Sequence, residues 1–223
     1  MTIAILAAAC RRLFRALTFL GLAAAALPAQ AGSYLANKPG ELKPEERVKP
    51  PAAQPVQLLV TFQRDGTAVP KVLKIVRPKV ERELKASGMF TTLSDTPVPN
   101  GAIVSVTINN ITEKGAAGKG FKTGLTFGLA GTMVTDRYKV TVDYVPAAGK
   151  PTVTRVVDHA IFTTIGLKST PPADATKMQS LLDAFDGVVR QTVAHALNGI
   201  AADPAVAGAE RAAEAAPPPA AAK

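Results

Sequence analysis

The sequence predicts an α+β fold: a mainly antiparallel sheet of about four strands with two helices packed on one face, in the order β-α-β-β-β-α. Two observations carry this prediction. Apolar and polar residues alternate in four separate segments, and apolar residues recur at helical spacing in two others. The chain has 223 residues, of which 47% are hydrophobic. That length and composition suit one packed domain with tails.

The first part of the domain is predicted to be a strand followed by a helix. Apolar side chains alternate from Val56 to Arg64, and the turn residues Asp65 and Gly66 end that strand. Apolar residues then recur at helical spacing between Pro70 and Gly88. Pro78 either kinks this helix or occupies its first turn, and the helix is expected most clearly from Pro78 to Ser87. Its solvated face is expected to carry Lys79, Arg82 and Lys85.

Three further strands are predicted at residues 102–112, 135–145 and 153–165. Each segment is rich in β-branched residues or places apolar side chains on alternate positions. Residues 146–151 contain two prolines and a glycine and are typical of a hairpin loop. We therefore expect these strands to form an antiparallel meander.

The last predicted element is a helix with an apolar stripe from Met178 to Ile200. Asp174 is a suitable N-cap residue, and Gly187 on the buried side allows close contact with a sheet. We expect this helix to cover one face of the meander, since an apolar sheet face needs a cover. The alternative is that the stripe binds a partner.

The first 31 residues have the layout of a secretory signal peptide. Three arginines precede an apolar run, which ends in the cleavage signal Ala29-Gln30-Ala31, and no acidic residue is present. The alternative is a retained N-terminal anchor. Both a cleaved signal peptide and a retained anchor predict a periplasmic location. We further expect association with the outer membrane. The sequence leaves open whether export follows the general or the twin-arginine route.

Two tails are expected to bracket one α+β domain at residues 56–204. Residues 32–55 are rich in Pro and Lys and favour an extended linker, and residues 205–223 form an Ala/Pro-rich tail expected to be disordered. Loss of residues 1–31 would lower the formal net charge from +9 to +6, since they hold three arginines and no acid. Outside the cytoplasm, such a charge is explained by solubility alone or, alternatively, indicates anionic lipid or an acidic envelope protein as partner rather than nucleic acid.

Few residues are suited to catalysis or to binding a cofactor or metal. The two histidines, His159 and His195, read as structural, and Asp158 points to the strand face opposite His159. With so few histidines and no cysteine after Cys10, a zinc site is not expected. Asp183 and Asp186 lie one helical turn apart and read as a solvated helix face. We therefore predict no catalytic residues, no metal site, no cofactor and no enzymatic activity.

A glycine-rich segment at residues 115–133 is the most unusual part of the sequence. Gly120, Gly124 and Gly128 recur every four residues, which on a helix would form a strip that another backbone can approach closely. The apolar side chains of this segment would face elsewhere, and they are Phe121, Leu125, Phe127 and Leu129. We expect a flexible connection with some apolar residues packed under the sheet. The alternative is contact with a membrane or self-association, which includes a homo-oligomer.

The predicted order of elements resembles a class of small Gram-negative periplasmic and outer-membrane lipoproteins. The resemblance rests on Leu84 to Phe90, on Gly124 to Leu129 and on Asp136 to Tyr138. This class includes auxiliary components of ABC transporters and envelope-assembly factors, many of unknown function. Its members usually carry a lipidated cysteine at the mature N-terminus, and this sequence has none near Ala31.

These observations together predict a non-enzymatic accessory or binding protein of the cell envelope that acts through protein or lipid contacts. The resemblance implies no catalytic residues to carry over. The alternative is an envelope protein that inserts into a membrane or self-assembles through residues 115–133.

Overall fold

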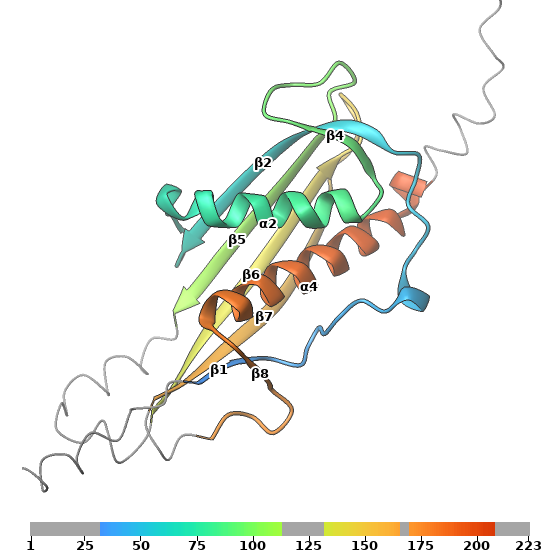
Figure 1. Cartoon of the computed structure of the whole chain (residues 1–223). Coiled ribbons are helices and arrows are strands. Elements are labelled where there is room, and N and C mark those ends of the chain that lie inside the picture. Colours follow the sequence, from blue (N-terminus) through green and yellow to red (C-terminus); the bar gives the residue numbers. More distant parts are fainter. Residues whose placement is uncertain (1–31, 113–131, 166–169, 208–223) are drawn as a thin grey trace, which may run out of the picture. The chain divides into compact units, whose positions relative to one another are not determined.

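The computed structural model describes residues 32–112, 132–165 and 170–207, all within a compact unit that runs from Ala31 to Lys223. These residues form an α+β domain in which two long helices cover one mixed sheet (Figure 1). The strands are β1 (Gly32–Leu35), β2 (Gln54–Arg64), β3 (Thr67–Ala68), β4 (Phe90–Ser94), β5 (Ile103–Thr112), β6 (Thr132–Val145), β7 (Val153–Ile165) and β8 (Thr176–Met178). The helices are η1 (Pro44–Glu46), η2 (Pro70–Val72), α2 (Leu73–Ala86) and α4 (Leu181–Ala201).

The sheet has the strand order β3-β2-β5-β6-β7-β1-β8, and β4 also pairs with β2. The strands β5, β6 and β7 form the antiparallel meander that the sequence predicts. In contrast, β2 runs parallel to both β4 and β5. Parallel neighbours need a crossover connection, and α2 supplies it between β2 and the strands that follow.

The predicted four-strand, mainly antiparallel sheet is therefore wrong. The sheet contains eight strands and is mixed, because β2 runs parallel to β4 and β5 while its other pairings are antiparallel. The strands absent from the prediction, β1, β3, β4 and β8, have between two and five residues. Strands this short show no measurable alternation of apolar residues, and tertiary pairing decides their structure.

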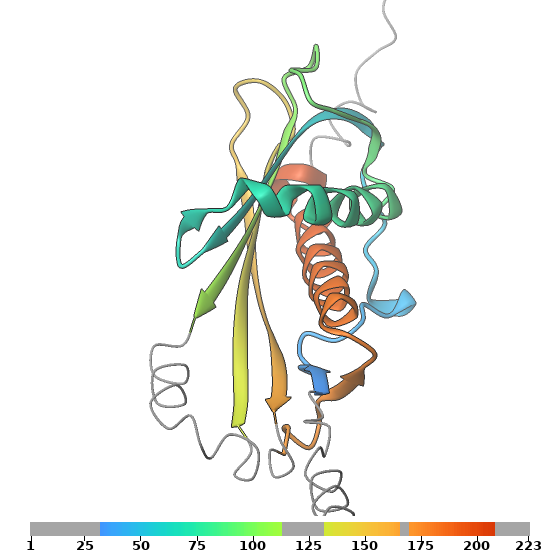
Figure 2. The same cartoon turned by 60° about the vertical axis from the view of Figure 1, so that its left-hand side comes forward.

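The core lies between the sheet and both helices, which cover the same face (Figure 2). Helix α2 contributes Val76, Val80 and Leu84, none of which has any exposed surface. Helix α4 packs mainly on β7 and crosses β1 closely at Gly187. A Cβ atom at Gly187 would lie 2.5 Å from Cδ2 of Leu35, so any larger residue would force the Leu35 side chain to shift.

Both helices begin at residues other than the predicted ones. Helix α2 starts at Leu73 and runs through Pro78, which lies inside the helix rather than at its first turn. Helix α4 begins at Leu181, and its N-cap is Ser180 rather than Asp174. The Ser180 hydroxyl accepts a hydrogen bond from the backbone N–H of Asp183, as a capping side chain does.

Residues 36–53, which we call the strap, connect β1 to β2 along the outer side of α4 (Figure 1). The strap falls within the segment expected to be a linker, and it is fastened to α4 at two places. The Asn198 side chain accepts from the N–H of Val48 at 2.7 Å and donates to the carbonyl of Glu46 at 3.0 Å. Farther along, Glu41 binds Arg190. The strap is thus part of the folded unit.

Candidate functional site

The residues predicted to contact a membrane or to self-associate lie outside the described residues. They are Gly120, Phe121, Gly124, Leu125, Phe127, Gly128 and Leu129. The strands on either side are described and pair with each other as far as Thr112 and Asp136. Among the described helices, none is long and apolar enough to cross a bilayer. The role of this segment stays a prediction.

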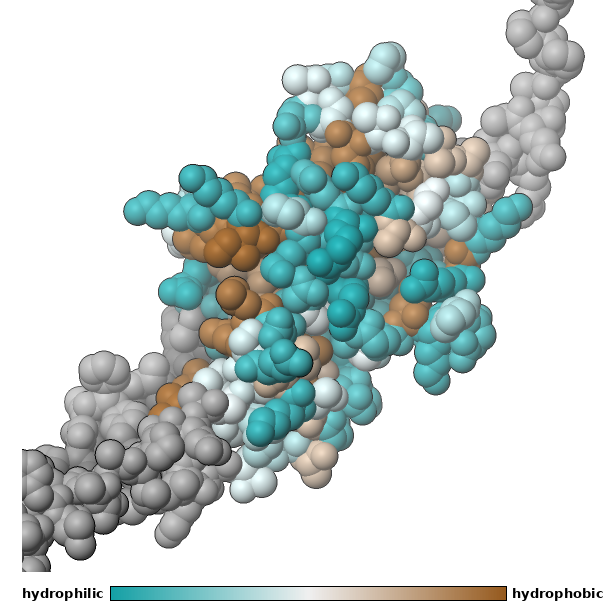
Figure 3. All heavy atoms as spheres, in the orientation of Figure 1, coloured by the Kyte–Doolittle hydropathy of each residue, from teal (hydrophilic) through white to brown (hydrophobic). Residues whose placement is uncertain are grey.

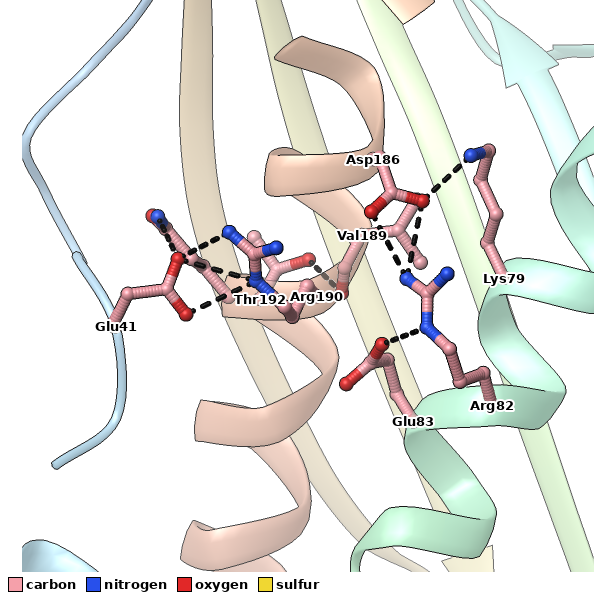
Figure 4. Close-up of polar contacts among 9 residues, drawn as sticks. Glu41, Lys79, Arg82, Glu83, Asp186, Val189, Arg190 and Thr192 are labelled. Atoms are coloured by element: carbon pink, nitrogen blue, oxygen red, sulfur yellow. Dashed lines mark hydrogen bonds and ion pairs between the residues drawn. The ribbon is translucent and has the colours of Figure 1, made fainter. Parts of the chain in front are cut away.

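Charged side chains join the facing sides of α2 and α4 in a group that we call the helix seam, formed by Lys79, Arg82, Glu83 and Asp186 (Figure 4). The Lys79 ammonium group donates to Oδ1 of Asp186 at 2.6 Å. The Arg82 guanidinium group donates to both oxygens of Asp186, at 3.1 and 3.0 Å, and to Oε1 of Glu83 at 2.9 Å. The seam therefore locks the two helices in register.

The electrostatics of the seam stabilise the ionised form of Asp186. Burial alone would raise the pKa of this carboxyl group, but hydrogen bonds and positive charge from Lys79 and Arg82 outweigh it, and the pKa is lowered. Lys79 and Asp186 are each only 22% exposed, so solvent screens this pair less than a surface ion pair.

A second polar group fastens the strap to α4 and the sheet. Arg190 donates to both carboxylate oxygens of Glu41, and the Gln191 amide donates to Oε1 of Glu41 at 2.9 Å. The Gln191 carbonyl oxygen lies 2.7 Å from Nε2 of His159. Since Nδ1 of His159 accepts from the N–H of Ala160, Nε2 carries the proton and donates to Gln191. Burial lowers the pKa of His159, which favours the neutral ring that this chain requires.

The structure places the four polar residues singled out in the sequence in structural roles. His159 belongs to the chain just described, and Nε2 of His195 lies 3.2 Å from the carbonyl oxygen of Gly40. Asp183 interacts with Ser180 at the start of α4, and Asp186 lies in the helix seam. Glu41 was missed, because it contacts a residue 149 positions away and shows no local signal.

The outer side of η2 and α2 carries a row of exposed residues that we call the outer stripe, with Lys71 in η2 and Lys74, Ile75, Pro78 and Lys85 in α2. Spacings of three, four and seven residues place them on one side of the helix, and the exposed Arg82 lies in the same row between Pro78 and Lys85. Within the described residues, no acidic side chain forms an ion pair with any of the three lysines. Ile75 is 50% exposed. Of the predicted solvated face, Arg82 and Lys85 are exposed, and Lys79, which is only 22% exposed and pairs with Asp186, is the residue predicted wrongly.

Two further exposed apolar side chains lie at the start of α4. Leu181 and Leu182 are 50% and 61% exposed there. Figure 3 shows apolar surface (brown) on this side of the molecule, bordered by hydrophilic side chains (teal). This combination of exposed apolar groups and unpaired lysines is typical of surfaces that contact a membrane.

A cavity of about 250 Å³ lies where the strap, the end of α2 and the second half of α4 meet. Most of its wall is apolar, with Leu42 and Val48 from the strap, Met89 after α2, and Ala194 and Leu197 from α4. Its polar lining residues are Arg47, Glu83, Ser87 and Asn198. No cluster of three or more metal-ligating side chains occurs in the described ranges.

The chain matches no known family model and no curated protein. Among solved structures, it is similar to the PelC dodecamer from Paraburkholderia phytofirmans, with 15% identity, a TM-score of 0.34, and coverage of 70% of this chain and 96% of that one. It is also similar to a neuraminyllactose-binding hemagglutinin homolog from Helicobacter pylori, with 8% identity, a TM-score of 0.45, and coverage of 79% and 95%.

Proposed function

We propose that the protein is a non-enzymatic accessory protein of the cell envelope that docks on an anionic lipid surface through the outer stripe of α2. The observation that carries the proposal is the set of three exposed lysines without an acidic partner among the described residues; two of them, Lys71 and Lys74, lie within one turn of the half-exposed Ile75. The proposed location is the periplasm, on the surface of a membrane.

The physics of such docking combines charge and apolar contact. A lysine near an anionic membrane surface contributes about 1 kcal/mol of attraction, and this attraction weakens as salt is added. An exposed apolar side chain beside the lysines adds the free energy of leaving water for the acyl boundary. Lys71, Lys74 and Ile75 lie within one turn of each other, so they reach the same lipid patch together.

The test is co-sedimentation of the full chain with vesicles of phosphatidylglycerol and of phosphatidylcholine. We expect retention on the anionic vesicles, loss of retention at 0.5 M salt (about a 3–5 Å Debye length), and weak retention on the zwitterionic ones. The variant Lys71→Glu/Lys74→Glu should bind anionic vesicles at least about tenfold more weakly.

The matched control is Lys150→Glu, a charge reversal in the exposed turn between β6 and β7. This variant should bind like the original protein, because only the outer stripe is proposed to touch lipid. Equal binding by all three proteins would overturn the proposal and would favour an acidic protein as partner, or anchoring through residues 1–31 or 115–133.

The alternative of membrane insertion or self-assembly through residues 115–133 is separately testable. Gly124→Leu and Gly128→Leu would disrupt a small-residue strip and should abolish assembly if that strip packs against another backbone. Unchanged assembly and membrane retention in both variants would exclude this role.

A further inference from the structure

The cavity between the strap, α2 and α4 has a basic side chain at its mouth. Arg47 lines the cavity from the strap and is exposed. No acidic side chain forms an ion pair with Arg47 among the described residues. Its neighbour Glu46 accepts a hydrogen bond from the backbone N–H of Lys43 instead. The Arg47 guanidinium group is therefore available to an anion.

The acidic side chain that also lines the cavity, Glu83, already interacts with two arginines. Its Oε1 accepts from Arg82 at 2.9 Å, and its negative charge also acts on the Arg190 guanidinium group. Every buried side-chain nitrogen and oxygen atom among the described residues has a hydrogen-bond partner, so Glu83 does not require a ligand. The charge that remains to select the polar end of a ligand is that of Arg47.

The apolar part of the wall is suited to a hydrocarbon chain. Leu42 and Val48 line it from the strap, and Met89 and Leu197 line it from the helix side. Val48 is 40% exposed although it is apolar. A chain lying in the cavity would remove this apolar surface from water, which is favourable.

We propose that this cavity binds the anion of a medium-chain fatty acid. The planar guanidinium group of Arg47 can donate two parallel hydrogen bonds to the carboxylate at the mouth. The hydrocarbon chain lies against Leu42, Met89 and Leu197. A volume of about 250 Å³ is below the roughly 300–1,000 Å³ of pockets that hold drug-sized ligands, so the cavity admits one chain and not a two-chain lipid. This inference goes beyond the proposed lipid docking and does not depend on it.

The strap offers a site-specific measure of this binding. Each of its lysines precedes a proline, and trypsin does not cleave before proline, so the Arg47–Val48 bond is the one in the strap that trypsin can cut. The Asn198 side chain holds both sides of that bond, through the N–H of Val48 and the carbonyl of Glu46. Cleavage therefore requires local opening of the strap, which a ligand bound between the strap and α4 would oppose.

The experiment is calorimetric titration of the purified full chain with octanoate, octan-1-ol and octylamine, each below the concentration at which it forms micelles. We expect octanoate to bind most tightly, octan-1-ol less tightly and octylamine least, because only the carboxylate pairs with Arg47. In parallel, saturating octanoate should slow tryptic cleavage of the Arg47–Val48 bond.

Two variants separate the head of the ligand from its chain. Arg47→Gln should weaken octanoate binding at least about fivefold and leave octan-1-ol binding unchanged, because it removes a charge-assisted hydrogen bond. Ala194→Leu, which extends a larger side chain into the cavity, should weaken all three ligands. The matched control is Lys38→Gln, which removes an exposed basic residue of the strap that does not line the cavity. This variant should bind octanoate like the original protein, and circular dichroism checks that every variant is folded.

Octylamine binding as tightly as octanoate would overturn the proposal, and so would octanoate binding that neither Arg47→Gln nor Ala194→Leu weakens. The lipid-docking variant Lys71→Glu/Lys74→Glu should leave octanoate binding unchanged. A loss of octanoate binding in that variant would place the fatty acid on the outer stripe and would also overturn the assignment to the cavity, whereas failure of vesicle binding alone would leave it standing.

Discussion

Helix α2 presents two basic surfaces that differ in whether their charges are paired with an acidic side chain. On the seam side, Lys79 and Arg82 share the carboxylate of Asp186; Lys79 is only 22% exposed, whereas Arg82 is 51% exposed. On the outer stripe, Lys71, Lys74 and Lys85 are exposed, and none pairs with an acidic side chain among the described residues. The same residue types therefore fix the helix in place on one side and leave charge available for a partner on the other. The net charge of the chain alone cannot distinguish the basic residues of the seam from those of the outer stripe.

Substitutions of apolar residues are expected to give the largest difference in the free energy of unfolding between the two sides of α2. Leu84 is fully buried beneath the helix, whereas Ile75 is half exposed on the outer stripe. We expect Leu84→Ala to lower the free energy of unfolding by about 2–5 kcal/mol, since it leaves a cavity in the core. Ile75→Ala should change it by at most about 0.5 kcal/mol, because an exposed position leaves no cavity. Urea unfolding followed by circular dichroism measures both.

A large loss of stability in Ile75→Ala would contradict this comparison. It would mean that Ile75 packs against a part of the protein outside the described residues. The outer stripe would then belong to the fold and would not be free to touch lipid.

The comparison also shows what the sequence could and could not predict. Long segments with clear periodicity were found, namely the strands β2, β5, β6 and β7 and both helices, because each repeats its pattern over ten or more residues. The parallel pairing of β2 with β5 was not found, since alternation shows which face is buried but not the direction of the neighbouring strand. Short β1 lies in a segment read as a linker, and pairing with β7 makes it a strand.

The candidate sites were predicted less well than the fold. Asp186 was noticed only as a solvated acid, because its partners lie on α2, more than 100 positions earlier in the chain. The lysines of α2 were noticed as a group, but the division between seam and outer stripe depends on how α4 packs. Such divisions follow from tertiary contacts, which have no local sequence signal.

Replacing the acidic residue of the seam is expected to have an intermediate effect on the free energy of unfolding. Asp186→Asn leaves Lys79 and Arg82 without their shared carboxylate, and we expect a loss of about 1–3 kcal/mol in the free energy of unfolding at pH 7. Because the pKa of Asp186 is lowered in the folded protein, its contribution is present above the unfolded pKa of 3.8 and is lost as the pH falls below it. The two proteins should therefore converge in stability on acidification, as urea unfolding at a series of pH values would show. A difference that persists at pH 2 would contradict an ionic origin.

Removing single lysines of α2 is expected to have the smallest effect on the free energy of unfolding. This comparison tests most directly whether the outer stripe and the seam differ. Lys74→Ala should change the free energy of unfolding by at most about 0.5 kcal/mol, because the lysine has no ionic partner among the described residues. Lys79→Ala should cost about 1 kcal/mol or more, because it removes a charge-assisted hydrogen bond from a half-buried carboxylate. Paired urea titrations at low and high salt would measure the difference. If Lys74→Ala were as costly as Lys79→Ala, the charge of the outer stripe would already be used in folding, and binding to an anionic surface would have to compete with contacts inside the protein.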